Sequence, residues 1–371
     1  MTFQISSRCD FDDLITGAKI LGCGGGGEES LANVRADFMV EHDLAVTIIS
    51  PNDLTPTDFL CVSGMVGGRH SPEYRSYTNG LEESVSWPML TATHDLQSFL
   101  SRDFTALIST EIGAGNFLAP MLVAARMGIA VVDGDLCGRA KPEISISTSN
   151  LTGLSITPLS IVSRYDDRFI LATSQTDQRA EDLARKLSVL SGGSIGVARC
   201  PHFWKEYQKA VLPDSISKSR AIGSALRAAR SKGRDPLPRL AALIEGSIVF
   251  QGKVSQFQSR DVAGFVVGEL LLRNSTSVFK IWFKNEYLVS WLNDEPFVTA
   301  PDLLCVVDSV TGEGLTPWAQ DFPKDRSVTV LAAPNAKIWH TPHGLALFGP
   351  KHFGFDIPYR TIDDLLSTYS L

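Results

Sequence analysis

The sequence of 371 residues contains no apolar run long enough to cross a membrane, which takes about 20 residues in a helix. Its first residues include Arg8, Asp10 and Asp12, where a signal peptide would need an apolar stretch. Lysine and arginine form no long run, and the formal net charge is −7. The sequence therefore indicates no positively charged surface that would bind the phosphate backbone of a nucleic acid. These absences predict a soluble, cytoplasmic protein that binds neither membrane nor nucleic acid.

Motifs of several well-known site types are also missing. The six cysteines stand singly, without the C-x-x-C spacing of a zinc site or a redox dithiol, and read as reduced thiols. There is no nucleophile elbow, no H-E-x-x-H zinc motif and no kinase signature, so the conventional hydrolase classes are disfavoured.

What is present is the composition of an ordinary globular protein. Hydrophobic residues make up 44% of the chain and charged residues 20%, and the mean hydropathy is +0.05. Since single cores stop growing near about 250 to 300 residues, the length predicts two domains, which we place at residues 1–165 and 166–371.

The N-terminal part shows the pattern of an α/β domain. Short apolar runs at residues 45–49, 59–63, 105–109 and 129–133 are typical of strands, and residues 117–127 have helical spacing. A strand, a helix and a strand in succession indicate a parallel crossover unit. Open sheets of this kind bind ligands at the carboxyl ends of their strands.

The C-terminal part changes character along its length. Residues 178–189 and 215–232 have helical patterns, and the second, basic segment reads as a solvated face. Beyond residue 244, β-branched and apolar runs separated by turn residues predict a β-rich domain. We count residues 344–350 among these strands and expect Pro342 to exclude a helix there.

The glycine run at residues 22–27 formally satisfies G-x-G-x-x-G, but a helical pattern precedes it where a dinucleotide site needs a strand. No nucleotide cofactor is therefore expected. Gly25, Gly26 and Gly27 are candidate substrate-binding residues, because open backbone N–H groups at the start of a helix can hold a carboxylate or an oxyanion. A tight turn that needs positive φ angles is the alternative.

The most informative segment follows the strand at residues 129–133. It contains Asp133, Asp135, Cys137, Arg139 and Glu143 within eleven residues. Charges beside a core are costly unless they pair, bind metal or take part in chemistry. The segment is therefore the candidate active site, with an Asp–Arg139 ion pair that fixes a loop as the alternative.

Two further segments are expected near the same sheet edge. Glu111 and Asn116 end one strand and open the next helix, so they would lie beside Asp133, unless they only cap that helix. His70 and Glu73 follow the strand at residues 59–63 and are candidates for ligand binding or proton transfer, although a loop histidine is more often a plain surface residue.

Taken together, these motifs resemble the S-methyl thiohydantoin desulfurase domain family over nearly the whole chain. The resemblance rests on Gly24–Gly27, Glu111 to Gly113 with Asn116, Asp133 to Glu143, Phe250 to Lys253, Asn285 with Glu286, Pro301 to Leu303, Asp308 with Thr311 to Glu313, and Gly349 to Asp356. Two departures are Lys141, where the family usually has an aromatic or apolar residue, and Arg69 with His70, which replace a smaller pair. These departures indicate that the pocket accepts a ring substituent different from the one usual in the family, and a more anionic substituent is one option.

The resemblance implies an α/β domain that carries the site, a β-rich C-terminal domain, and removal of sulfur from a five-membered thiohydantoin ring. Family members often accompany hydantoinase and oxoprolinase-type ring hydrolases. Two alternatives stay open, namely ring opening as in those enzymes, and a non-catalytic accessory subunit that binds such a ring.

For desulfuration, water must add to the ring carbon and sulfide or a thiol must leave. We expect Asp135 or Glu111 to activate the water, directly or as ligands of a divalent metal such as zinc, for which Asp133, Asp135 and Cys137 are the candidate ligands. Arg139 would hold a substrate carboxylate or carbonyl, and Glu143 would donate a proton. A homo-oligomer is expected only because soluble enzymes commonly form one.

Overall fold

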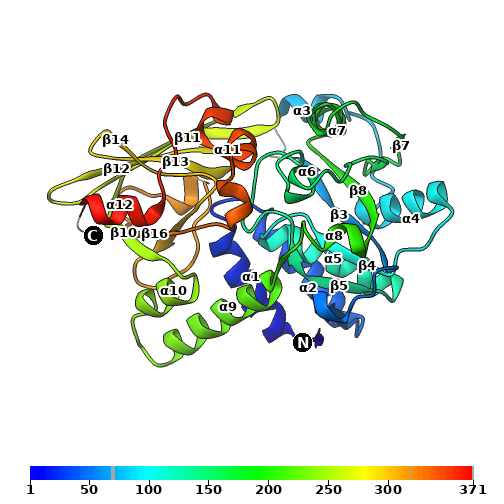
Figure 1. Ribbon diagram of the computed structural model, residues 1–371, viewed down its shortest axis with the longest axis horizontal. Coiled ribbons are helices and arrows are strands. Elements are labelled where there is room, and N and C mark those ends of the chain that lie inside the picture. Colours follow the sequence, from blue (N-terminus) through cyan, green and yellow to red (C-terminus); the bar gives the residue numbers. More distant parts are fainter. Residues whose placement is uncertain (68–71, 318, 370–371) are drawn as a thin grey trace.

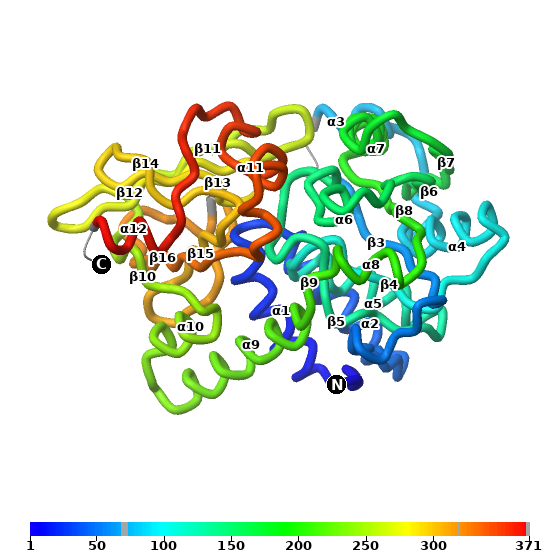
Figure 2. Tube along the Cα trace, in the orientation of Figure 1, coloured from blue at the N-terminus to red at the C-terminus, as the bar shows by residue number. Residues whose placement is uncertain are grey.

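The computed structural model describes residues 1–67, 72–317 and 319–369, and shows two β-sheets side by side with helix α1 between them (Figure 1). The Cα trace in Figure 2 shows the N-terminus at the lower edge of the molecule, midway along its length, and helix α12 (Ile362–Tyr369) at the outer side of the second sheet. His70 lies outside the described residues, so its predicted role stays a prediction.

The first sheet is mixed, and four neighbouring strands at its centre, β2, β5, β4 and β3, run parallel. In sheet order its strands are β1 (Phe3–Ile5), β2 (Val46–Ile49), β5 (Ala130–Asp135), β4 (Ala106–Ser109), β3 (Phe59–Gly67), β8 (Ser194–Phe203), β6 (Leu159–Val162) and β7 (Arg168–Leu171), and β9 (Leu212–Pro213) pairs with β5. Strands β6 and β7 lie on either side of the boundary placed at residues 165 and 166, yet they pair in this sheet.

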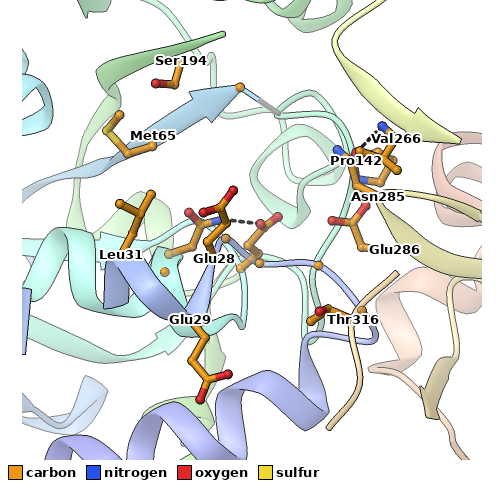
Figure 3. Close-up of a pocket in the computed structure, with 18 of the residues that line it drawn as sticks. Glu28, Glu29, Leu31, Met65, Pro142, Ser194, Val266, Asn285, Glu286 and Thr316 are labelled. Carbon is orange, nitrogen blue, oxygen red and sulfur yellow. Dashed lines mark hydrogen bonds between the residues drawn. The ribbon is translucent and has the colours of Figure 1, made fainter. Parts of the chain in front are cut away.

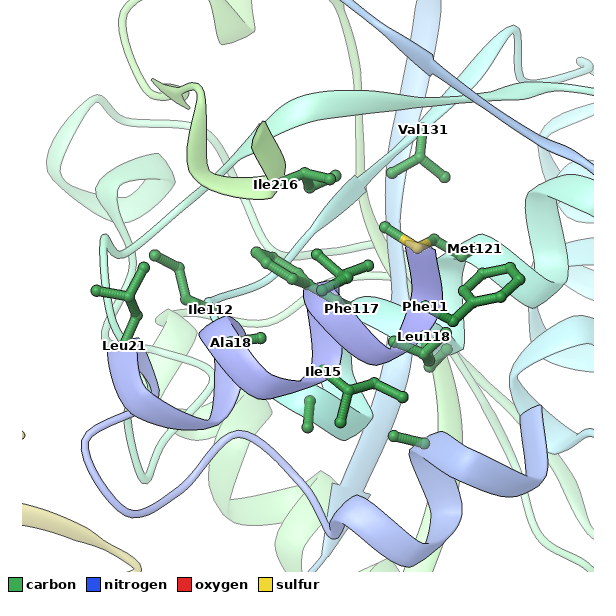
Figure 4. Packing of buried hydrophobic residues seen from close by; sticks show 14 of the residues in the cluster. Phe11, Ile15, Ala18, Leu21, Ile112, Phe117, Leu118, Met121, Val131 and Ile216 are labelled. Atoms are coloured by element: carbon green, nitrogen blue, oxygen red, sulfur yellow. The ribbon is translucent and has the colours of Figure 1, made fainter. Parts of the chain in front are cut away.

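The helices of this half surround the sheet and include the predicted crossover. They are α1 (Arg8–Leu21), α2 (Glu29–Glu41), α3 (Pro72–Ser76), α4 (Pro88–Leu100), α5 (Ala114–Met127), α6 (Thr148–Leu151), α7 (Asp177–Leu190), α8 (Trp204–Tyr207), α9 (Ser215–Ser231) and α10 (Leu237–Leu243), with a 3₁₀ turn η1 (Pro51–Asp53). The unit β4–α5–β5 is confirmed. Figure 4 shows Phe11 and Ile15 of α1 around Phe117 of α5, with Val131 of β5 above them in this view.

The second sheet is antiparallel throughout. Its order is β14 (Glu295–Thr299), β13 (Glu286–Leu292), β12 (Val278–Lys284), β11 (Phe265–Arg273), β10 (Ser247–Val262), β16 (Ser327–Ala333) and β15 (Leu303–Asp308). Short helical elements accompany it, namely η2 (Ala319–Asp321), η3 (Lys337–His340), α11 (Pro342–Phe348), η4 (Pro350–Phe353) and α12 (Ile362–Tyr369). The predicted class, an α/β domain with parallel crossover units followed by a β-rich domain, is confirmed.

One expected strand is wrong, because residues 344–350 lie in α11 and η4. Pro342 begins α11 rather than excluding it: the first helical position needs no backbone N–H donor, and the fixed φ of proline suits it. The side chain of Thr341 caps the helix by accepting from Gly344 N.

Helix α9 packs closely against α1, and glycines make the approach possible. A Cβ added at Gly17 would lie 1.8 Å from Ser219 O, and one at Gly223 would lie 1.8 Å from Asp13 O. Arg227 donates two hydrogen bonds of 2.8 Å to the Asp13 carboxylate. Within the described ranges, no helix is both long enough and apolar enough to span a bilayer.

Candidate active site

A cavity of about 640 Å³ lies where the two halves meet, a size ordinary for a small-molecule site. Its walls come from the glycine loop before α2, the end of β3, the start of α5, residues 141–144 and the start of β13. Figure 3 shows Met65 and Leu31 on one side and Asn285 and Glu286 on the other. The site therefore needs both sheets.

The glycine loop is packed backbone against backbone on the loop before α5. A Cβ added at Gly26 would lie 2.4 Å from Gly113 Cα, and one at Gly27 would lie 3.0 Å from Gly115 Cα. Asn116 N donates to Gly26 O at 3.0 Å. In the described part of the chain, the N–H groups of Gly26 and Gly27 have no acceptor, so they remain available to a ligand.

Glu111 lies in the cavity wall just before that helix. Its side chain is buried, with Oε1 accepting from Asn116 Nδ2 at 2.5 Å and Oε2 accepting from Lys141 N at 3.1 Å. Burial raises the pKa of Glu111 to about 7, against the lowering effects of the Lys141 charge and of these two hydrogen bonds. A carboxyl group with this pKa can take up or release a proton near neutral pH.

Glu286 is a second buried carboxyl group in the same cavity. Its position in the sequence alone led us to assign it no role. It is 2% exposed, and its Oε2 has no hydrogen-bond partner among the described residues. Burial and the charge of Glu111 raise the pKa of Glu286 well above its usual value. The available signal was a carboxylate next to a buried apolar strand, the same pattern that drew attention to Asp133.

Glu111 and Glu286 are thus two buried carboxyl groups in the wall of one cavity, and both have a raised pKa. Because each negative charge disfavours the other, the two groups ionise in sequence rather than together. The pKa of Glu111, about 7, allows this group to exchange a proton near neutral pH, and burial raises the pKa of Glu286 well above its usual value. Two carboxyl groups that ionise in sequence can supply a general base and a general acid in one site.

Lys141 lies beside Glu111 and is almost entirely buried. It is 4% exposed, and its Nζ has no hydrogen-bond partner among the described residues. Burial lowers the pKa of Lys141, while the charges of Glu111 and Asp135 act in the opposite direction. The family departure noted in the sequence is thus part of the cavity wall.

Glu143 lines the cavity, but its carboxylate is held by Lys284 and His352. Its Oε1 accepts from Lys284 Nζ at 2.6 Å and its Oε2 from His352 Nε2 at 3.2 Å. These partners lower the pKa of Glu143 to about 2, although burial opposes them. The proton-donor role expected of Glu143 fits it poorly, because the group stays ionised at neutral pH.

Asp133 and Asp135 lie in the last three residues of β5, and their side chains accept hydrogen bonds mainly from backbone N–H groups. Asp133 accepts from Ile216 N and Ser217 N at 3.1 Å each and from Ser217 Oγ, which caps the start of α9. Asp135 accepts from Cys137 N and Gly138 N at 2.8 Å each, and burial raises its pKa to about 6. Neither side chain lines the cavity.

Arg139 is also directed away from the cavity. Its guanidinium donates to Asp302 O at 2.5 Å and Tyr287 O at 2.6 Å, which ties the loop after β5 to the second sheet. The side chain is fully buried. From the sequence we expected Arg139 to bind a carboxylate or carbonyl group of a substrate. In the structure its guanidinium binds main-chain carbonyl groups of the protein.

The proposed zinc ligands do not fit a metal centre. Asp133 uses both carboxylate oxygens, and Asp135 its Oδ2, on hydrogen-bond donors of the protein. Burial raises the pKa of the Cys137 thiol well above its usual value, which disfavours the thiolate that zinc needs. Across residues 1–67, 72–317 and 319–369, no group of three or more His, Cys, Asp or Glu side chains is placed to hold a metal ion.

Two protein-family models match the chain, one in its N-terminal part and one in its C-terminal part. The model of the S-Me-THD-like N-terminal domain matches residues 9–173, and that of the S-Me-THD-like C-terminal domain matches residues 175–362. The crystal structure of a protein from Chromobacterium violaceum superposes with a TM-score of 0.79 at 21% identity, covering 97% of this chain and all of that chain, which is a likeness of fold. No curated protein matches the chain.

Proposed function

Since the chain belongs to the S-Me-THD-like family, we propose that it is an enzyme that removes sulfur from a five-membered thiohydantoin-like ring. The observation that carries the proposal is the Glu111–Glu286 pair, two buried carboxyl groups in the wall of one cavity, where burial raises the pKa of each. Replacing C–S by C–O needs one group to take a proton from water and another to give one to sulfur. The pair can do both.

In the proposed first step, Glu111 takes a proton from a water molecule whose oxygen forms a bond with the ring carbon that bears sulfur. The electron pair of the C=N or C=S bond moves onto nitrogen or sulfur, and a tetrahedral intermediate results. Asn116 and Lys141 N fix the orientation of the Glu111 carboxylate through their hydrogen bonds. Positioning of this kind lowers the barrier by reducing the freedom lost in the transition state.

In the second step, Glu286 gives its proton to sulfur, the C–S bond breaks, and sulfide or a thiol leaves. The new C–O–H group then passes its proton to Glu286 and becomes a carbonyl, and Glu111 gives the proton that it took from water to the ring nitrogen or to the departing sulfide. Both carboxyl groups thereby regain their starting states, and one water is consumed for each sulfur released. The free N–H groups of Gly26 and Gly27 are suited to stabilise the negative charge of the intermediate. No step requires a metal ion.

The proposal is tested with S-methyl thiohydantoin, 2-thiohydantoin and hydantoin in water enriched in ¹⁸O. We expect release of methanethiol or sulfide together with a hydantoin that carries one ¹⁸O atom. Glu111→Gln and Glu286→Gln should each lower kcat by about 10²-fold or more, the usual contribution of general acid–base catalysis. Glu41→Gln, at the exposed end of α2, is the matched control.

Other products would identify the alternatives. A ring-opened carboxylic acid that retains its sulfur or oxygen would indicate a hydantoinase-like reaction. Binding of the rings without any turnover would indicate an accessory subunit. Either result, or full activity in both glutamine variants, would refute desulfuration by this pair.

A further inference from the structure

Two of the six cysteines lie in contact where the two halves of the protein meet. Cys23 lies in the glycine loop between α1 and α2, and Cys305 lies in β15 of the second sheet. Their sulfur atoms are 3.8 Å apart, although the two residues are 282 positions apart in the sequence, and both side chains are fully buried. The contact therefore joins the two halves through a pair of thiols.

The two thiols differ in acidity. Burial raises the pKa of Cys23, but the hydrogen bond from Cys305 and the charge of Arg139 together outweigh burial and bring this pKa below its usual value. The hydrogen bond with Cys23 and burial raise the pKa of the Cys305 thiol well above its usual value. A thiolate is the form of cysteine that reacts with oxidants, and a neighbouring thiol can react with the first product. Cys23 thus has the character of the attacking group and Cys305 that of its partner.

The cavity gives a small molecule an approach to Cys23. Gly24, the next residue in the chain, lines the cavity together with Gly25. Buried thiols are inert where no reagent comes near them. Because Cys23 adjoins a residue of the cavity wall, an oxidant of the size of a few atoms that enters the cavity reaches the loop that carries this thiol.

The other four cysteines have no such sulfur contact. Cys9 is exposed, and Cys61, Cys137 and Cys200 are buried. No hydrogen bond between sulfur atoms involves any of these four, all of which lie in the described ranges. Burial and the charge of Cys200 raise the pKa of Cys61, so these two are the competing pair that an experiment has to distinguish.

We propose that Cys23 and Cys305 are a redox modification site, where hydrogen peroxide converts the two thiols into a disulfide. The Cys23 thiolate attacks one peroxide oxygen, the O–O bond breaks, and the products are a sulfenic acid and hydroxide, which takes up a proton to become water. The Cys305 thiol then attacks the Cys23 sulfur, the S–O bond breaks, and a second water leaves with the Cys305 proton. Two electrons pass from the sulfur atoms to peroxide, which is reduced to two waters.

The disulfide ties the glycine loop to the second sheet. Sulfur atoms in a disulfide are about 2.05 Å apart, so the two sulfurs have to approach each other by roughly 1.8 Å from the 3.8 Å of the reduced pair. A cross-link between residues 282 positions apart restricts the unfolded chain strongly, which favours the folded state. Oxidation should therefore stabilise the protein, and this effect does not depend on the reaction that takes place in the cavity.

The test uses Cys9→Ser, which removes the exposed thiol and with it cross-links between molecules. The protein is treated with hydrogen peroxide, the remaining thiols are blocked with iodoacetamide, and its peptides are mapped by mass spectrometry. We expect a cross-linked Cys23–Cys305 peptide that is lighter by two hydrogen atoms than its two parts and that dithiothreitol cleaves. The melting temperature should rise by about 4 °C or more on oxidation and return on reduction.

Two variants in the same background show which thiols are responsible. Cys305→Ala should lose both the cross-linked peptide and the rise in melting temperature, whereas Cys137→Ala, which removes another fully buried thiol, should keep both. Peptide mapping of the protein with all its buried thiols gives the answer even if Cys305→Ala does not fold. A disulfide between Cys61 and Cys200 in its place, oxidation of Cys23 that ends at a sulfinic acid, or an unmodified Cys23 would each overturn the proposal.

Discussion

The carboxyl group of Glu286 lies so close to the Cα of Gly25 that a Cβ added there would be 1.9 Å from Oε1. Gly25 belongs to the loop between α1 and α2, and Glu286 begins β13 of the second sheet. The contact joins the two halves of the protein at the cavity wall. A side chain at position 25 must therefore displace either the loop or the carboxyl group.

We predict that Gly25→Ala inactivates the enzyme while the protein still folds. The added methyl group would push the Glu286 carboxyl out of its place in the cavity wall, and overpacking of this kind costs about 1 to 3 kcal/mol of stability. Steady-state kinetics and urea unfolding measure the two effects. Gly64→Ala is the control, because nothing lies within 4 Å of a Cβ there, and equal activity of the two variants would contradict the prediction.

The pH dependence of the reaction should follow the two carboxyl groups. Glu111 must be ionised to act as a base, and burial raises its pKa to about 7, so kcat/KM should fall about tenfold per pH unit below that value. Glu286 must keep its proton, so the rate should fall again in alkaline solution, above the raised pKa of Glu286. A profile that is flat between pH 5 and 7, roughly the range that the Glu111 pKa governs, would rule out Glu111 as the base.

Parts of the site could be predicted from the sequence because their signal is local. Glu111, Asn116 and the glycines lie at junctions of regular elements, and all of them line the cavity. The strand, helix and strand order correctly brought Glu111 near the end of β5. These inferences required only periodicity and the geometry of a parallel sheet.

The rest of the site depends on contacts between distant segments. In the sequence, Asp133 cannot be distinguished from a catalytic carboxylate. The structure shows that Asp133 accepts hydrogen bonds from N–H groups at the start of α9, more than eighty residues later in the chain. Glu286 comes from the other sheet, and Arg139 finds its acceptors there. A sequence pattern shows that a charge is buried but not which segment neutralises it.

Replacement of Arg139 should affect stability more than substrate affinity. Arg139→Met would leave Asp302 O and Tyr287 O without their buried donors, at a cost of about 2 to 4 kcal/mol. Urea unfolding should show this loss. Arg168→Met, at an exposed ion pair, should change stability little. A large rise in KM with unchanged stability would instead favour the substrate-binding role expected of Arg139 from the sequence.

Glu143 should stabilise the fold in a pH-dependent manner. Its folded-state pKa of about 2 lies below the ordinary 4.5, so the stability that the ionised carboxylate contributes through Lys284 and His352 is fully present above pH 4.5 and is lost as the pH falls toward 2. Glu143→Gln should therefore be less stable than the wild type at pH 7, by about 1 to 3 kcal/mol, and the difference should shrink on acidification. Asp356→Asn removes the exposed pair with Lys351 and should have almost no effect at either pH. If Glu143 were instead the proton donor of the reaction, its glutamine variant would lose activity at neutral pH without this pH-dependent loss of stability, and unfolding curves at pH 7 and pH 3 decide between the two roles.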